Sequence, residues 1–137
     1  MLRFDLELAL IGGDLAAADL PGAWRDGMRD LLGIDVPSDR LGVLQDMHWS
    51  FGAFGYFPTY ALGTLLAAQL WQVARADLPD LDDRIEAGDL APLREWLAEK
   101  VHRHGKRLTP RDLIRSATGA DLSADAYLAF ARERAGT

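Results

Sequence analysis

Cysteine is absent from the 137 residues of this chain. Its absence excludes a disulfide scaffold, a metal site built on thiolates and a cysteine nucleophile. The chain also lacks a run of about 18 apolar residues, so we expect no helix that spans a membrane. Its first residues lack the basic region and the apolar stretch of a signal peptide. Together these absences predict a cytoplasmic protein that does not contact a membrane.

Basic residues are fewer than acidic ones: 15 Lys and Arg stand against 21 Asp and Glu, which gives a formal net charge of -6. A nucleic-acid-binding protein is usually basic, so we expect no nucleic-acid partner. Residues 100–115 are the exception, with six basic residues and one acid, Asp112. We expect these cations to pair with acidic neighbours on a solvated face; an anion-binding patch is the alternative.

The chain holds enough apolar material for a packed core. Hydrophobic residues make up 49% of it and charged residues 26%, so disorder is not expected. Its length fits one domain, which we place at residues 1–137.

Apolar side chains at helical spacing, with capping residues before them and glycines after them, predict six helices. The helices lie at residues 20–32, 58–77, 80–88, 92–104, 110–119 and from 123 onward. Their expected capping residues are Asp19, Asp80, Thr109 and Ser123. The helix at 58–77 is apolar on nearly all sides, so we expect it to be central and buried, packed by the helices at 20–32 and 92–104. No sheet is predicted, and the fold class is all-α.

Residues 2–11 are ambiguous. Leucine and other apolar residues alternate there with charged residues or alanine, which is typical of a half-buried strand. No other segment offers a partner strand, and leucine, glutamate and alanine favour a helix. Both structures remain open from the residues alone.

The three histidines do not form a metal site by themselves. No H-E-x-x-H pattern is present, and His102 and His104 are about 200° apart on a helix. Glu99 shares a face with His102, but a metal pair of this type needs a second copy, which the sequence lacks. A phosphate-binding glycine loop and a serine nucleophile elbow are also missing. The residues alone therefore predict no complete catalytic site and no metal on this chain.

Residues 34–57 have no regular period and hold many aromatic side chains. Within them the pattern G-x-x-Q-D-x-H-W is formed by Gly42, Gln45, Asp46, His48 and Trp49. The run F-G-Y-F-P-T-Y-A-L-G follows from Phe54, and V-H-R-H-G-K-R lies at residues 101–107. These segments, with L-R-F-D-L-E at residues 2–7, resemble in order the C-terminal part of the Taq-type (thermostable carboxypeptidase 1-like) family, metal-dependent exopeptidases of the H-E-x-x-H class.

This resemblance implies a mostly helical peptidase fold and a helix at residues 2–11. In full-length family members the H-E-x-x-H helix, a third zinc ligand (a glutamate) and a substrate-binding arginine lie upstream of the part present here. The resemblance therefore implies zinc, or another divalent metal, in the full-length enzyme and none on this chain. We expect the chain alone to be inactive, with a missing N-terminal peptidase part as its partner and a peptide as substrate only in the completed site.

The resemblance also suggests site residues. Peptide hydrolysis needs a hydrogen-bond donor for the oxyanion of the tetrahedral intermediate, and His48 with Tyr60 or Tyr56 is suited to that role. Tyr60 is favoured because the helix at 58–77 holds it rigidly. We expect Asp46 to accept a hydrogen bond from the other ring nitrogen of His48.

Two further residues complete the predicted pocket, and one alternative function remains. Gln45 is expected to help orient His48, and Trp49 to wall the pocket. Phe54, Phe57 and Trp71 are expected to be core residues.

The alternative to a peptidase part is a non-catalytic helical module for protein interaction, which forms a homodimer through the aromatic segment 49–60 and residues 2–11.

Overall fold

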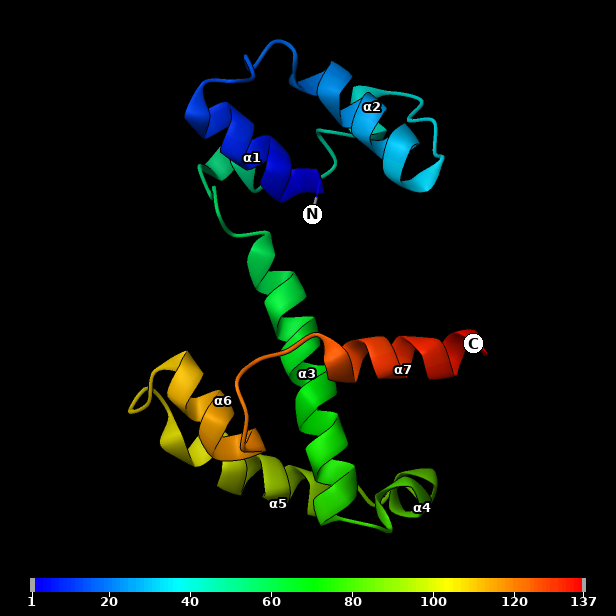
Figure 1. The fold of residues 1–137 in the computed structure, drawn as a ribbon, viewed down its shortest axis with the longest axis vertical. Helices are drawn as coiled ribbons and strands as arrows, with labels where there is room; N and C mark the ends of the chain where they lie inside the picture. Colours follow the sequence, from blue (N-terminus) through cyan, green and yellow to red (C-terminus); the bar gives the residue numbers. More distant parts are fainter. Residues whose placement is uncertain (1, 137) are drawn as a thin grey trace. The chain divides into compact units, whose positions relative to one another are not determined.

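The computed structural model describes residues 2–136, and within that range every regular element is helical (Figure 1). The α-helices are α1 (Leu2–Gly12), α2 (Leu20–Leu32), α3 (Pro58–Asp77), α4 (Leu81–Glu86), α5 (Ala91–Lys100), α6 (Pro110–Thr118) and α7 (Asp125–Ala135). Three short 3₁₀ helices are η1 (Asp39–Leu41), η2 (Trp49–Phe51) and η3 (His102–His104). The all-α prediction is confirmed, and the ambiguous first segment is a helix. In the described range no helix is long and apolar enough to cross a membrane.

The chain divides into two compact units, Met1–Ala61 and Leu62–Thr137. Each unit has its own cluster of buried apolar residues. The single domain expected over residues 1–137 stays a prediction.

The core of the first unit lies where α1 packs against α2. Its buried residues are Leu6, Trp24 and Val43. Burying large apolar side chains of this kind stabilises a fold by about 1.5–3 kcal/mol each. The indole of Trp24 also meets the Trp49 ring edge to face, with 6.4 Å between centroids. This contact joins the core to the aromatic segment.

The core of the second unit lies between the C-terminal half of α3, α4 and α5. Ala74, Leu81 and Trp96 are buried there, and Trp71 packs against them. The prediction that the helix at 92–104 packs against the long apolar helix is therefore confirmed. It ends earlier than expected, at Lys100, and the 3₁₀ helix η3 continues the chain to Gly105.

The long helix α3 is less covered than its sequence suggests. Its buried residues are Gln69 and Ala74, whereas Tyr60 and Leu62 are 55% and 50% exposed. The prediction that α3 is buried on most sides is wrong for this chain. An apolar sequence indicates that burial of the helix is favourable, but it does not show that other residues of the same chain bury it. Phe54, expected in the core, is likewise exposed.

The predicted helix caps differ in outcome. The Thr109 hydroxyl oxygen accepts a hydrogen bond from the backbone N–H of Asp112 at 3.2 Å, so that cap is confirmed. Asp19 and Asp80 precede α2 and α4 but make no side-chain capping bond. Ser123 lies two residues before α7 and accepts a 2.9 Å hydrogen bond from the first backbone N–H of that helix.

Candidate active site

The first residue of the G-x-x-Q-D-x-H-W pattern is a glycine because no side chain fits there. A Cβ at Gly42 would lie 2.5 Å from Cγ1 of Val36 and 3.1 Å from the indole nitrogen of Trp24. The backbone of Gly42 therefore packs directly against the Trp24 side chain.

The three residues expected to stabilise an oxyanion lie together in the first unit. His48 immediately precedes η2, and its Nε2 lies 3.2 Å from the hydroxyl oxygen of Tyr60 in the first turn of α3. The Tyr56 ring stacks on the imidazole at 5.3 Å and meets the Tyr60 ring edge to face at 5.4 Å. Phe57 covers another side of the imidazole at 4.7 Å. Of the two tyrosines, Tyr60 makes the hydrogen bond with His48, and Tyr56 makes the ring stack.

The two ring nitrogens of His48 have different surroundings. Nδ1 is buried and has no hydrogen-bond partner among the described residues. Nε2 is therefore the ring nitrogen through which His48 shares a hydrogen bond with the Tyr60 phenol, and the tautomer of the imidazole decides which of the two groups donates.

The expected bond between Asp46 and His48 is not formed. Asp46 makes an ion pair with Arg3 of α1 instead. The Arg3 guanidinium also stacks over the rings of Trp24 and Phe57, at 4.5 and 5.0 Å from their centroids. Asp46 lies only two residues from His48, but the cation that α1 supplies decides its contact, because a carboxylate and a guanidinium form a charge-assisted hydrogen bond, which is stronger than an ordinary one. Gln45 is exposed.

Tyr60 has a perturbed acidity. Partial desolvation of its hydroxyl raises the pKa of Tyr60 above 10.0, and the neighbouring Tyr56 phenol raises it further. Both effects disfavour the phenolate. At neutral pH Tyr60 is therefore a neutral phenol, which is a hydrogen-bond donor.

Glu7 is a site residue that the sequence reasoning missed. It is 3% exposed on α1, and its carboxylate accepts hydrogen bonds from Trp49 Nε1 at 2.8 Å and from the Gly55 backbone N–H at 3.1 Å. In the alternating pattern of residues 2–11, Glu7 falls on the polar side, which predicts exposure. The one signal available was its place in the L-R-F-D-L-E segment.

An open hollow lies beside Tyr60 in the first unit. Its volume is about 420 Å³. It is lined by Leu2, Arg3, Trp24, Met28, Leu31, Leu32, Phe57, Tyr60 and Ala61. The hollow is mainly apolar. The face of α2 that carries Met28 forms one part of its lining, and the first turn of α3 forms another.

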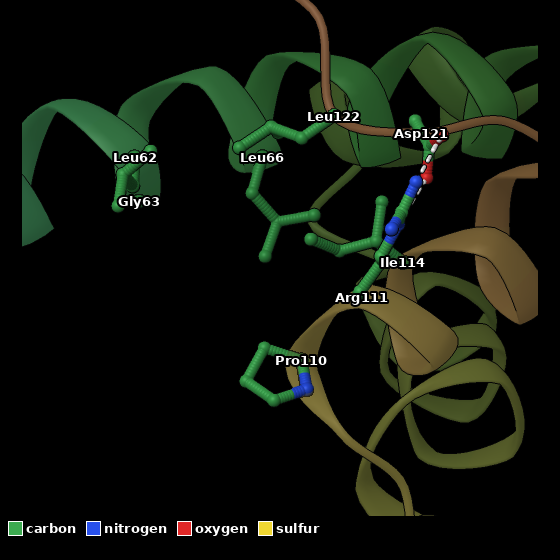
Figure 2. A pocket seen from close by; sticks show the side chains of 8 residues that line it. All are labelled: Leu62, Gly63, Leu66, Pro110, Arg111, Ile114, Asp121 and Leu122. Carbon is green, nitrogen blue, oxygen red and sulfur yellow. Dashed lines mark hydrogen bonds and ion pairs between the residues drawn. The ribbon is translucent and has the colours of Figure 1, made fainter.

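A separate pocket of about 540 Å³ lies in the second unit, between α3, α6 and the segment before α7 (Figure 2). Arg111 lines it and pairs with Asp121, which also pairs with Arg115. These two guanidinium groups hold the pKa of Asp121 well below its usual range. None of the predicted site residues lines this pocket.

Four of the six cations in residues 100–115 have acidic partners, as expected. Lys100 pairs with Asp77 and Arg103 with Glu99, in addition to the two arginines on Asp121. The solvated-face interpretation is therefore confirmed for these four cations.

The residues that the structure describes do not gather the ligands of a catalytic metal ion. Across residues 2–136, the His, Asp and Glu side chains form no group of three or more that could hold one. A catalytic zinc site needs three protein ligands. Neither His102 nor His104 belongs to such a group.

The site residues fall within a sequence that matches known metallopeptidases. The family described as carboxypeptidase Taq (M32) metallopeptidase matches residues 1–135. Carboxypeptidase 1 of Bacillus subtilis is 46% identical over 123 residues, which are 90% of this chain and 25% of that protein. Thermostable carboxypeptidase 1 of Thermus thermophilus is 43% identical over 134 residues, which are 98% of this chain and 26% of that protein.

Solved structures agree with the sequence comparison. The crystal structure of the M32 carboxypeptidase from Deinococcus radiodurans matches with a TM-score of 0.93 and 43% identity, covering 98% of this chain and 27% of that one. The chain thus spans about a quarter of the length of the relatives that it matches. The family implies a divalent metal in the full-length enzyme. With its motif, its helices and nearly all of its length matched, this chain belongs to the carboxypeptidase Taq (M32) metallopeptidase family.

Proposed function

We propose that this chain forms the C-terminal part of a cytoplasmic carboxypeptidase that releases C-terminal amino acids from peptides. Zinc, or another divalent metal, is held by a part of the enzyme that this chain does not contain. Within the completed site, His48 and Tyr60 bind the oxyanion that forms when the scissile carbonyl is attacked. By itself the chain holds no metal ion and hydrolyses no peptide, because catalytic zinc needs three protein ligands.

The hydrogen bond between His48 and Tyr60 is the observation that supports this role. The 3.2 Å contact between His48 Nε2 and the phenol oxygen orients Tyr60, while partial desolvation and the neighbouring Tyr56 raise the pKa of Tyr60 and keep its phenol neutral. A neutral phenol donates to an oxyanion without competing as a base, and a donor aimed at the developing charge acts mainly in the transition state. Tyr56, stacked on the imidazole, limits its rotation.

The test is reconstitution with the part of a relative that precedes the matched region. This chain is fused behind the first three quarters of Carboxypeptidase 1 of Bacillus subtilis, and release of the C-terminal amino acid from a short peptide is measured. We expect activity in the fusion and none in either part alone.

Variants of the active fusion then test the residues. His48→Ala and Tyr60→Phe should each lower kcat by about 10²- to 10³-fold with little change in KM, since the lost donor acts mainly in the transition state. His102→Ala, in η3 of the other unit, is the matched control and should leave kcat unchanged. A folded but inactive fusion would favour the non-catalytic module, and an unchanged kcat in His48→Ala would reassign His48 to packing.

A further inference from the structure

We infer that Glu7 is a positioning residue: its buried carboxylate fixes residues 49–55 and thereby holds His48 opposite Tyr60. This inference rests on the proposed function for its catalytic consequence, but its structural part can be tested on this chain alone.

Glu7 is buried on α1. A carboxylate that is 3% exposed is costly unless it is hydrogen-bonded, and Glu7 uses both of its oxygens. Oε1 accepts from the Trp49 indole and Oε2 from the Gly55 backbone N–H. Hydrogen bonds to an ionised acceptor are about twice as strong as neutral ones. Both donors belong to the aromatic segment, so the carboxylate ties α1 to that segment at two points.

The two donors to Glu7, Trp49 and Gly55, stand at the two ends of residues 49–55. Trp49 directly follows His48, and Gly55 directly precedes Tyr56, whose ring stacks on the imidazole. Gly55 has a φ of 77°, a left-handed conformation that favours glycine and directs its N–H toward Glu7.

Backbone hydrogen bonds link the segment to His48. The His48 carbonyl accepts hydrogen bonds from the backbone N–H groups of Phe51 at 3.2 Å and Ala53 at 2.9 Å. Movement of residues 49–55 therefore moves the backbone that carries the imidazole. The hydrogen bonds of the Glu7 carboxylate go to Trp49 and Gly55, so Glu7 acts on His48 through the segment.

Glu7→Gln on this chain alone is the first test. The side chain keeps its size, but the amide NH₂ faces one of the two donors and can replace only one of the two accepted bonds. We expect hydrogen exchange of the Gly55 amide to accelerate at least about tenfold and the ring resonances of His48 and Tyr60 to shift. Asp5→Asn, an exposed acid on the same helix, is the control and should change neither.

Trp49→Phe is a second, milder variant that removes a single donor and retains an aromatic ring. It should shift the His48 resonances and leave the Gly55 amide protected, which keeps the inference testable if Glu7→Gln fails to fold. Unchanged exchange at Gly55 and unchanged His48 resonances in folded Glu7→Gln would overturn the inference, whatever the activity of the fusion.

A double-mutant cycle in the active fusion separates positioning from general stability. Glu7→Gln should lower kcat by about 10- to 100-fold with the wild-type His48 present. In the His48→Ala background the same change should cost little more, because Glu7 acts through His48. Equal losses in both backgrounds would overturn the positioning role, while an inactive wild-type fusion would contradict the proposed function alone.

Discussion

The indole Nε1 of Trp96 donates a 2.8 Å hydrogen bond to Oδ2 of Asp77, which joins α5 to the last residue of α3. Lys100 Nζ lies 3.4 Å from the same oxygen. The indole bond, followed by the lysine charge, lowers the pKa of Asp77 below 3.8 against the opposing effect of partial desolvation. The ionised carboxylate of Asp77 thus stabilises the packing of α3 against α5.

This contact predicts acid sensitivity in the second unit. Because the folded state has the lower Asp77 pKa, its stabilisation is complete above the unfolded pKa of about 3.8 and is lost as the pH falls through the folded pKa. Urea unfolding followed by the Trp96 indole resonance should show constant stability from pH 7 to about pH 5 and a decline below pH 4. Asp121, whose pKa Arg111 and Arg115 also hold low, contributes to the same decline, so Asp77→Asn should make it shallower without abolishing it. An equally steep decline in this variant would contradict the assignment of Asp77.

Gly42→Ala should destabilise the first unit by about 1–3 kcal/mol, because the added methyl group overlaps Val36 and approaches the Trp24 indole. Gly22→Ala is the control: no atom lies within 4 Å of its Cβ, and it sits in α2. The control should be neutral or stabilising by about 0.5–1 kcal/mol. Equal urea midpoints for both variants would show that the motif glycine is not selected by space.

Gln69 links α3 to the segment between α6 and α7, and its loss should weaken that junction. Its amide nitrogen donates to the Thr118 hydroxyl at 3.0 Å, and its oxygen accepts from the Ser123 backbone N–H at 3.2 Å. Gln69→Ala removes both of these part-buried hydrogen bonds, each of which contributes about 0.5–1.5 kcal/mol. Faster hydrogen exchange at Ser123 should accompany the lower stability. The exposed Gln72→Ala is the control, and similar effects in both variants would refute a specific role for Gln69.

The titration of Tyr60 should lie above pH 10.0, since desolvation and Tyr56 disfavour its phenolate. A difference titration of the wild-type chain against Tyr60→Phe isolates this step by ultraviolet absorbance. The phenol is then neutral throughout the range from pH 6 to pH 9, so its ionisation should not shape the pH profile of the active fusion there. A Tyr60 step at or below pH 10 would contradict this assignment.

The apolar surface of the first unit should lead to association of the isolated chain. Leu31, Leu32 and Phe51 are more than 60% exposed there, and exposed apolar patches of this kind tend to be covered. We expect light scattering at micromolar concentration to report a homodimer, at twice 15.1 kDa. Phe51→Ser should shift it toward the monomer. A mass of 15.1 kDa that is independent of concentration would exclude the homodimer.

Local sequence determined the helices of this protein. Apolar spacing, Pro58 and the Thr109 capping pattern act within one or two turns, and these features place α2 to α7 within a few residues. The G-x-x-Q-D-x-H-W pattern likewise identified the family, because its side chains and spacing are specific without any knowledge of the fold. Residues 2–11 needed that resemblance, since their alternation also fits a strand.

Tertiary packing alone decided the partners of the site residues. Glu7 meets Trp49 and Gly55 across 42 and 48 residues of chain, and no local period reports contacts at that separation. For the same reason Asp46 was expected to bond His48, two residues away, whereas the fold supplies it with the more strongly attracting guanidinium of Arg3. Sequence thus determined which side chains the site contains, and packing determined which of them touch, because hydrogen bonds and ion pairs form between groups that the folded backbone brings within about 3 Å.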